Sequence, residues 1–179
     1  RFAASLTRVE ILAGVKFDVM TPYADRPTEG VFTVQCELLP LANPGFEPGP
    51  PNENSIELAR VVDRGIRSAE ILDVKSWMLA EGKVLGAFVD LYVLDHCGNL
   101  IDCASLAAMA ALANAKVPKF DAATGKVVRN DFTGPLPLAR KAASCSFEKI
   151  GGKMVLDATD EEEVASEGRL TLSTCDGDL

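Results

Sequence analysis

The amino-terminal part of the chain alternates apolar and polar positions and predicts two strands. Val9–Val19 alternates loosely and is rich in β-branched residues, and Gly30–Leu39 alternates after a break at Thr21–Pro27. A period of two places successive side chains on opposite faces of a strand. We therefore expect two strands separated by an irregular turn.

The next segment, Pro40–Pro51, holds five of the ten prolines. Proline fixes φ and removes a backbone donor, so this segment is predicted to be an ordered but irregular loop. A linker between domains is the alternative. Leu39, Leu41 and Phe46 favour the loop because they offer apolar anchors.

A helical period of about 3.6 residues follows this loop. Asn54 and Ser55 can cap a helix that is predicted to run to about Glu70. Its apolar stripe consists of Leu58, Ala59, Val62, Ile66 and Ala69, and the opposite stripe carries Arg60, Arg64 and Arg67.

A strand and a buried helix are predicted in the middle of the chain. Val84–Leu94 alternates and ends at the turn Asp95–Asn99, from which we expect a return through residues 100–101 as a β-hairpin. Cys103–Ala115 is apolar on nearly all faces, which predicts a buried helix that Pro118 ends.

The carboxy-terminal third predicts mainly strands. Phe120–Leu138 is expected to be loop-rich, Ala142–Lys149 and Lys153–Leu156 form a second hairpin, Asp157–Gly168 is an acidic loop, and Arg169–Cys175 is the last strand. Strands and helices that mix without strict alternation indicate an α+β fold.

The length of 179 residues suits a single domain, residues 1–179. Because the chain begins without Met, in mid-strand, and stops after a turn-like sequence, we expect it to be incomplete at both ends. No apolar stretch reaches the roughly 20 residues that a membrane span requires.

Charge and cysteine content restrict the chemistry. The net charge is −8, whereas free-standing nucleic-acid binders usually carry a basic excess, so RNA contact would need a local patch or a basic partner. Five scattered cysteines without a CxxC motif and one histidine, His96, argue against zinc. They indicate reduced thiols in a cytosolic, that is cytoplasmic, protein.

Motifs for nucleotide or cofactor binding are missing from the sequence. It has no P-loop, GxSxG, HExxH or dinucleotide fingerprint, and one histidine in a turn gives a Ser-His-Asp or Cys-His site little support. No cofactor is expected. The acidic run Asp160–Glu163 could hold Mg²⁺ or supply a general acid, but such a run is usually a solvated loop.

The arginine stripe allows two interpretations. Arg60 and Arg64 are like charges one helical turn apart, which repel each other unless something neutralises them. Guanidiniums on one rigid face suit phosphates about one nucleotide apart. The alternative is a salt-bridged surface, with pairs Asp63–Arg67 and Glu57–Arg60. Helix geometry alone leaves both open.

Four segments carry a resemblance to a known family: Leu38–Ala42, Phe46–Pro51, Glu57–Arg67 and Asp95–Asp102. From Val9 through Cys175 the chain resembles the RNase PH-like subunits of the RNA exosome, most of all the archaeal subunit that does not itself carry the active site. The resemblance implies a fold similar to ribosomal protein S5 domain 2.

The resemblance also implies a function and partners. Six such subunits, alternately catalytic and non-catalytic, form a ring around a pore, and single-stranded RNA is degraded from its 3′ end with phosphate as nucleophile, releasing nucleoside diphosphates. The implied partners are a homologous catalytic RNase PH-like subunit, single-stranded RNA and RNA-binding cap subunits, with no membrane.

Site residues follow from the same resemblance. The arginine helix of the non-catalytic subunit faces the partner's active site, which implies RNA contact by Arg60, Arg64 and Arg67. Catalytic relatives carry a Glu-Asp pair and a second Asp where this chain has Glu162, Glu163 and Arg169. An arginine stays charged, so it can neither donate a proton nor hold a divalent cation.

The resemblance therefore implies a non-catalytic subunit without catalytic or metal-binding residues. The family's usual glycine in the first turn is replaced near Thr7–Arg8. Two alternatives remain: a phosphorolytic 3′–5′ exoribonuclease with Glu162 and Glu163 at a metal, and a purely structural ring-assembly subunit whose arginines only pair with carboxylates of its neighbour.

Overall fold

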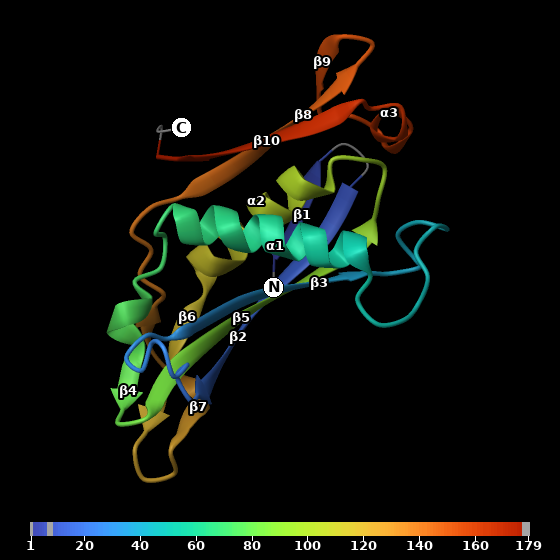
Figure 1. The fold of residues 1–179 in the computed structure, drawn as a ribbon. Coiled ribbons are helices and arrows are strands. Elements are labelled where there is room, and N and C mark those ends of the chain that lie inside the picture. The colour runs from blue at the N-terminus through green and yellow to red at the C-terminus, as the bar shows by residue number, and fades with distance from the viewer. Residues whose placement is uncertain (1, 7–8, 177–179) are drawn as a thin grey trace.

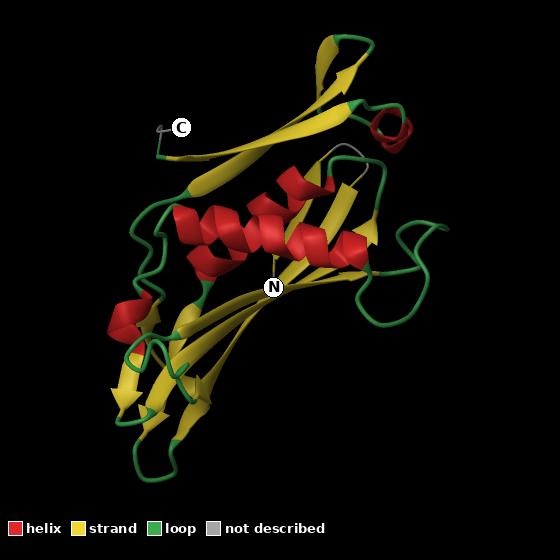
Figure 2. Cartoon of the chain, in the orientation of Figure 1, coloured by secondary structure: helices red, strands yellow, loops and turns green. Residues whose placement is uncertain are grey.

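The structure, a computed structural model, describes residues 2–6 and 9–176. Two helices lie between a five-stranded and a three-stranded sheet, so the chain forms three layers (Figure 1, Figure 2). The prediction of an α+β fold is confirmed. Thr7 and Arg8, near which the resemblance implies that the family's usual glycine is replaced, lie outside the described residues.

The five-stranded sheet is built around its long strand β5. The strand order is β1-β2-β5-β3, with β2 antiparallel and β3 parallel to β5, and β4 also pairs with β5. Val84–Ala87 of β5 are buried in succession, and from Ala87 to Val93 every second residue is buried, which puts the main core on one face of this part of the sheet. The bounds are β1 Phe2–Leu6, β2 Val9–Met20, β3 Val31–Leu38, β4 Met78–Ala80 and β5 Lys83–Asp95.

Helix α1 (Glu53–Ser68) confirms the helix predicted after the proline-rich loop. It begins two residues earlier than expected, because the side chain of the N-cap Asn52 accepts the Ser55 N–H at 2.9 Å. The predicted apolar stripe is buried at Leu58, Ala59, Val62 and Ile66. A short 3-10 helix, η1 (Val74–Trp77), then leads to β4.

The predicted hairpin return through Leu100 and Ile101 is wrong, because both residues form the first turn of α2 (Leu100–Asn114). Gly98 and Asn99 adopt positive φ angles of 106° and 46°, and the turn passes directly into the helix. A glycine-containing turn after a strand serves either connection. The predicted buried helix is confirmed, but it ends before Pro118, which lies in β6.

The loop-rich interpretation of Phe120–Leu138 is also wrong, since β6 (Lys116–Asp121) and β7 (Lys126–Pro135) form an antiparallel hairpin. Most side chains of β7 are exposed, so no apolar alternation marks it as a strand. The turn is fixed by Asp121, whose carboxylate accepts the Ala123 N–H at 2.9 Å and the Thr124 hydroxyl at 2.7 Å.

The three-stranded sheet confirms the second predicted hairpin and the last strand. Its order is β10-β8-β9, with bounds β8 Ala142–Ile150, β9 Lys153–Leu156 and β10 Gly168–Cys175. The predicted acidic loop contains a short helix, α3 (Asp160–Val164). Strand β10 approaches α1 closely at Gly65, where an added Cβ would lie 3.2 Å from the Ser173 Oγ.

The proline-rich segment is an ordered irregular loop, as predicted, and the predicted anchor Phe46 packs against the core, whereas the predicted anchor Leu41 does not. Phe46 stacks on His96 with ring centroids 5.3 Å apart. The backbone N–H of His96 donates to the carbonyl of the buried Ala42 at 3.2 Å. Leu41, expected to be an anchor, is 79% exposed because Ala42 takes the inward position.

Two further observations concern the whole described chain. All five cysteines lie within it, and no disulfide joins any two of them. Burial and the neighbouring Glu37 raise the pKa of the Cys36 thiol to about 12. Among the described residues, no helix has the length and apolar character needed to cross a membrane.

His96 gives a first test of this packing. Burial lowers the pKa of His96 below its usual 6.5, against the opposing charges of Glu163, Asp160 and Asp95. The unfolded chain therefore binds more protons than the folded chain just below pH 6.5, so this contribution to stability is present above pH 6.5 and lost as the pH falls. The imidazole signal in NMR spectra, assignable because His96 is the single histidine, is expected to titrate below 6.5. A midpoint at or above 6.5 contradicts the packing.

Gly98 gives a second test, because its φ of 106° and the approach of Thr159 leave no room for a side chain: an added Cβ would lie 2.6 Å from the Thr159 carbonyl carbon. Gly98→Ala is expected to lower the free energy of unfolding by about 3 kcal/mol or more. Gly151 is the control, since its φ is 54° but the surrounding space is open, and Gly151→Ala is expected to cost about 1 kcal/mol. Equal losses in urea denaturation would contradict the close approach.

Candidate functional site

Helix α1 turns Arg60 and Arg64 outward, as the sequence predicts. Its buried stripe packs into the core, and both arginines are exposed on the other side. Their Cα atoms are about 6 Å apart along the axis, at about 1.5 Å per residue. Neither arginine forms an ion pair within residues 2–6 and 9–176, and the Glu57–Arg60 pair that helix spacing allows is absent.

Arg67 differs from these two arginines because the chain itself engages it. Its Nε lies 2.6 Å from the Asp63 carboxylate one turn earlier, the ion pair that helix spacing allowed. Its Nη2 donates to the Phe32 carbonyl of β3, and its guanidinium lies 5.4 Å from the centre of the Phe32 ring. Arg67 therefore ties α1 to β3, whereas Arg60 and Arg64 remain available to a ligand.

Arg169, at the start of β10, lies in a cluster of carboxylates. Its Nε donates to Glu148 of β8, and its Nη2 lies 3.1 Å from Glu163 of α3. Glu148 is 4% exposed and also accepts the Ser166 hydroxyl at 2.6 Å. Glu163 accepts the Asn99 N–H at 2.8 Å, which links the cluster to the start of α2.

The electrostatics of the cluster keep Arg169 charged. Burial by itself lowers the pKa of Arg169, but the hydrogen bond with Glu148 and the charges of Glu163, Glu148 and Glu57 raise it above its usual value. The guanidinium supplies the positive charge that these carboxylates need. Because it has no proton to give at any relevant pH, Arg169 cannot act as a general acid.

The acidic run forms the short helix α3 and not a loop, which corrects that part of the prediction, but none of its residues is buried. Glu162 and Thr159 form a capping box, in which the Glu162 carboxylate accepts the Thr159 N–H at 2.9 Å. Asp160 accepts the Cys97 thiol at 3.7 Å and the Glu161 N–H at 3.0 Å. In the part of the chain that the structure describes, no three His, Cys, Asp or Glu side chains are grouped as a metal ion requires.

A hollow of about 700 Å³ opens beside the cluster, between the start of α1, the turn before α2, and α3. Its charged lining consists of Glu57, Asp160, Glu161, Glu163 and Arg169. Four carboxylates against one guanidinium repel a phosphate. The charge of this hollow is therefore unfavourable for an RNA backbone, whereas the exposed arginines of α1 carry the opposite sign.

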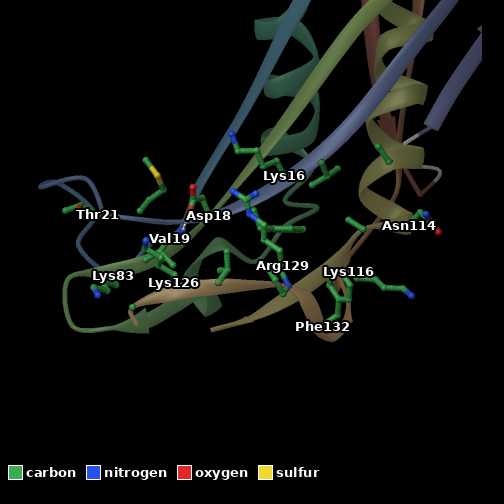
Figure 3. Close-up of a pocket in the computed structure, with 18 of the residues that line it drawn as sticks. Lys16, Asp18, Val19, Thr21, Lys83, Asn114, Lys116, Lys126, Arg129 and Phe132 are labelled. Carbon is green, nitrogen blue, oxygen red and sulfur yellow. Dashed lines mark hydrogen bonds between the residues drawn. The ribbon is translucent and has the colours of Figure 1, made fainter. Parts of the chain in front are cut away.

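A second hollow, of about 1210 Å³, was not predicted (Figure 3). We call it the basic groove; its charged lining is Lys16, Asp18, Lys83, Lys116, Lys126 and Arg129. These residues are far apart in the sequence and come from β2, β5, β6 and β7. The one sequence signal is residues 116–129, which hold four cations and one carboxylate.

Two models of one protein family match this chain. The model described as "3' exoribonuclease family, domain 1", RNase_PH, matches residues 3–118. The model for domain 2 of the same family matches residues 142–179.

Similar proteins include the exosome complex component Rrp42 of two archaea. The chain is 46% identical over 172 residues to that of Pyrococcus furiosus, an alignment that covers 94% of this chain and 62% of the relative. It is 44% identical over 169 residues to that of Methanothermobacter thermautotrophicus, covering 93% of this chain and 62% of the relative. The chain therefore spans slightly less than two thirds of the length of these relatives.

Solved structures agree with these matches. A chain of the Archaeoglobus fulgidus exosome "with RNA bound to the active site" superimposes with a TM-score of 0.85 at 42% identity, covering 97% of this chain and 66% of that one. A chain of an archaeal exosome core gives a TM-score of 0.77 at 38% identity, covering 94% and 62%. The domain 1 model matches most of this chain, and the fold follows these solved structures. The chain therefore belongs to the 3′ exoribonuclease family of RNase PH domains.

Proposed function

We propose that this chain is a non-catalytic ring subunit of an exosome, which contacts single-stranded RNA while a neighbouring homologous subunit performs phosphate-dependent 3′–5′ degradation. The observation that carries the proposal is the pair Arg60 and Arg64, exposed and without an ion pair among the described residues, on a helix whose other side is fixed in the core. Two like charges held one turn apart repel each other, and an RNA backbone relieves that repulsion.

The relatives support this proposal. Proteins 44–46% identical to this chain are named exosome complex component Rrp42, and a similar solved structure is an exosome with RNA bound. The proposed partners are a homologous catalytic subunit, RNA-binding cap subunits and single-stranded RNA. We also propose that the chain is a single folding unit, because α1 and α2 each pack against both the five-stranded and the three-stranded sheet. We further propose a cytoplasmic location, where cysteines without disulfides are usual.

The cluster around Arg169 supports the non-catalytic part. If Glu163 were to serve a metal or a leaving group, its carboxylate would have to leave Arg169 and the Asn99 N–H. Glu162 is likewise bound to Thr159 in the capping box. These commitments disfavour the alternative in which Glu162 and Glu163 carry the reaction in this chain.

Arg67 is less available to RNA than Arg60 and Arg64, because it is bound to Asp63 and to Phe32. We keep it as an RNA-contacting candidate that would act beside Arg60 and Arg64 while holding α1 to β3. The purely structural alternative is favoured by this one residue, since only Arg67 of the three is paired within the described chain.

The test is the variant Arg60→Ala/Arg64→Ala in a ring reconstituted with a catalytic-type subunit. Loss of two phosphate contacts is expected to reduce the slope of log affinity against log salt by about 1.4, since single strands give about 0.7 per phosphate. RNA binding is expected to weaken for all sequences and degradation to slow, while the ring keeps its mass, because neither arginine belongs to the core.

Arg140→Ala serves as the control, and Arg67→Ala gives a separate prediction for stability. Arg140→Ala removes an exposed arginine outside α1 and should leave the slope unchanged. Arg67→Ala is expected to lower the free energy of unfolding by about 1 kcal/mol, from the helix ion pair and the ring contact. An unchanged salt slope together with a dissociated ring for Arg60→Ala/Arg64→Ala would make these residues interface ion-pair partners and favour the structural alternative.

A further inference from the structure

The basic groove stands out against the charge of the whole chain. Its lining holds five cations and one carboxylate, although the chain carries a net charge of −8. Lys16, Lys83, Lys116, Lys126 and Arg129 are all exposed. Within residues 2–6 and 9–176, none of the five takes part in an ion pair.

The fold gathers these cations from separate elements. Lys16 lies on β2, Lys83 begins β5, Lys116 begins β6, and Lys126 and Arg129 lie on β7. In the view of Figure 3, Lys83 and Lys126 lie toward one end of the groove, Arg129 near its middle and Lys116 toward the other end. The Lys83 ammonium is held against the turn between β6 and β7, in the space beside Gly125 that a side chain would fill.

The groove has little of its own to balance this charge. Asp18, the single carboxylate in its lining, offsets at most one of the five positive charges and accepts the Val19 N–H at 2.8 Å. By contrast, Lys119, on β6 but outside the groove lining, pairs with Asp131 at 2.8 Å. The same hairpin thus pairs a cation outside the groove lining and, among the described residues, leaves the cations of the lining without an ion pair. Like charges held together on a fixed surface create a positive potential that attracts a polyanion.

Aromatic and apolar side chains favour RNA over an acidic protein segment. Phe132 lines the groove and is 46% exposed, and Phe17 lines it beside Lys16. Grooves that track single-stranded nucleic acid combine cations for the phosphates with exposed aromatic rings on which bases stack. An acidic peptide would use the cations but has no need of an exposed ring.

We propose that the basic groove is a second contact surface for single-stranded RNA, separate from the arginines of α1. It lies between the β6–β7 hairpin and the adjoining ends of β2 and β5, away from α3 and β10 (Figure 1). This inference rests on the proposed function, because it takes the same RNA as ligand. It adds a length requirement: RNA long enough to reach both surfaces gains affinity from the groove, and short RNA does not.

The test uses Lys83→Gln/Lys126→Gln/Arg129→Gln in the reconstituted ring, without phosphate so that RNA stays intact. Affinity is measured against salt concentration for polyadenylate of about 8 and about 30 nucleotides. The first length lies within the site size of single-strand binders, about 4–16 nucleotides, and the second exceeds it. For the long RNA, the variant is expected to lower the salt slope by about 2 and to weaken binding roughly tenfold or more at low salt. The short RNA is expected to bind α1 unchanged.

A matched control removes the same charge elsewhere. Lys75→Gln/Arg140→Gln/Lys153→Gln also neutralises two lysines and one arginine, all exposed and outside both surfaces, and should change neither RNA. An equal loss in the control would mean that only net charge matters, and that result overturns the inference.

Phe132→Leu separates RNA from other polyanions. It is expected to weaken binding of the long RNA about fivefold or more, since stacking contributes about 1–3 kcal/mol per base, and to leave binding of dextran sulfate unchanged because that polyanion has no bases. Loss of binding to both ligands, or to neither, contradicts a stacking contact.

The outcomes also separate this inference from the proposed function. If the groove variant changes nothing while Arg60→Ala/Arg64→Ala weakens RNA binding, the groove inference fails and the proposed function stands. If only the groove variant weakens binding, the groove stands and the α1 site fails. Unchanged RNA affinity with weaker capture of polyglutamate by the groove variant would assign the groove to an acidic protein partner and overturn the inference.

Discussion

The ion cluster around Arg169 is the contact on which the joining of the three-stranded sheet, α3 and the start of α2 depends. A single guanidinium joins β10 to Glu148 of β8 and to Glu163 of α3, and Glu163 in turn accepts the N–H of Asn99, the N-cap residue of α2. Removing one partner of a pair as buried as Glu148 leaves a charge without compensation, which usually costs about 3–5 kcal/mol. Arg169 therefore stabilises the sheet, and because its guanidinium stays charged it cannot itself donate a proton.

Charge is divided sharply over the surface. Carboxylates gather around the hollow at α3, while cations gather in the basic groove, and Arg60 and Arg64 are exposed together on one face of α1. An acidic chain can thus contact RNA through restricted basic surfaces, without the overall basic excess of a free-standing nucleic-acid binder. The proposed function requires such an arrangement, because it has this chain contribute part of a composite site and a neighbour supply the reacting groups.

Periodicity predicted the elements whose two faces differ. The buried stripe of α1 and the alternation of β2, β3 and β5 are visible in the sequence because each has one face in the core. The hairpin of β6 and β7 was missed because its side chains are mostly exposed and its strands are held by backbone hydrogen bonds and by Asp121. The start of α2 was missed because a turn through Gly98 and Asn99 fits a hairpin as well as a helix.

The candidate site was predictable only in part for a related reason. Helix geometry gives the direction of Arg60 and Arg64, but not that Arg67 reaches Phe32, 35 residues earlier. The partners of Arg169 lie 21 and 6 residues away, on different elements, and the basic groove draws on four strands. Such contacts between distant segments leave no period in the sequence, so they emerge only once the strands are paired.

The most direct test of the central claim, that Arg169 and its carboxylates leave this chain unable to catalyse, is phosphorolysis itself. RNA, phosphate and a divalent cation are supplied to the chain alone, to a ring with an active catalytic-type partner, and to a ring whose partner lacks its catalytic carboxylate. The account predicts release of nucleoside diphosphates from the second sample and from neither of the others. Release by the chain alone, abolished by Glu163→Gln, would contradict it.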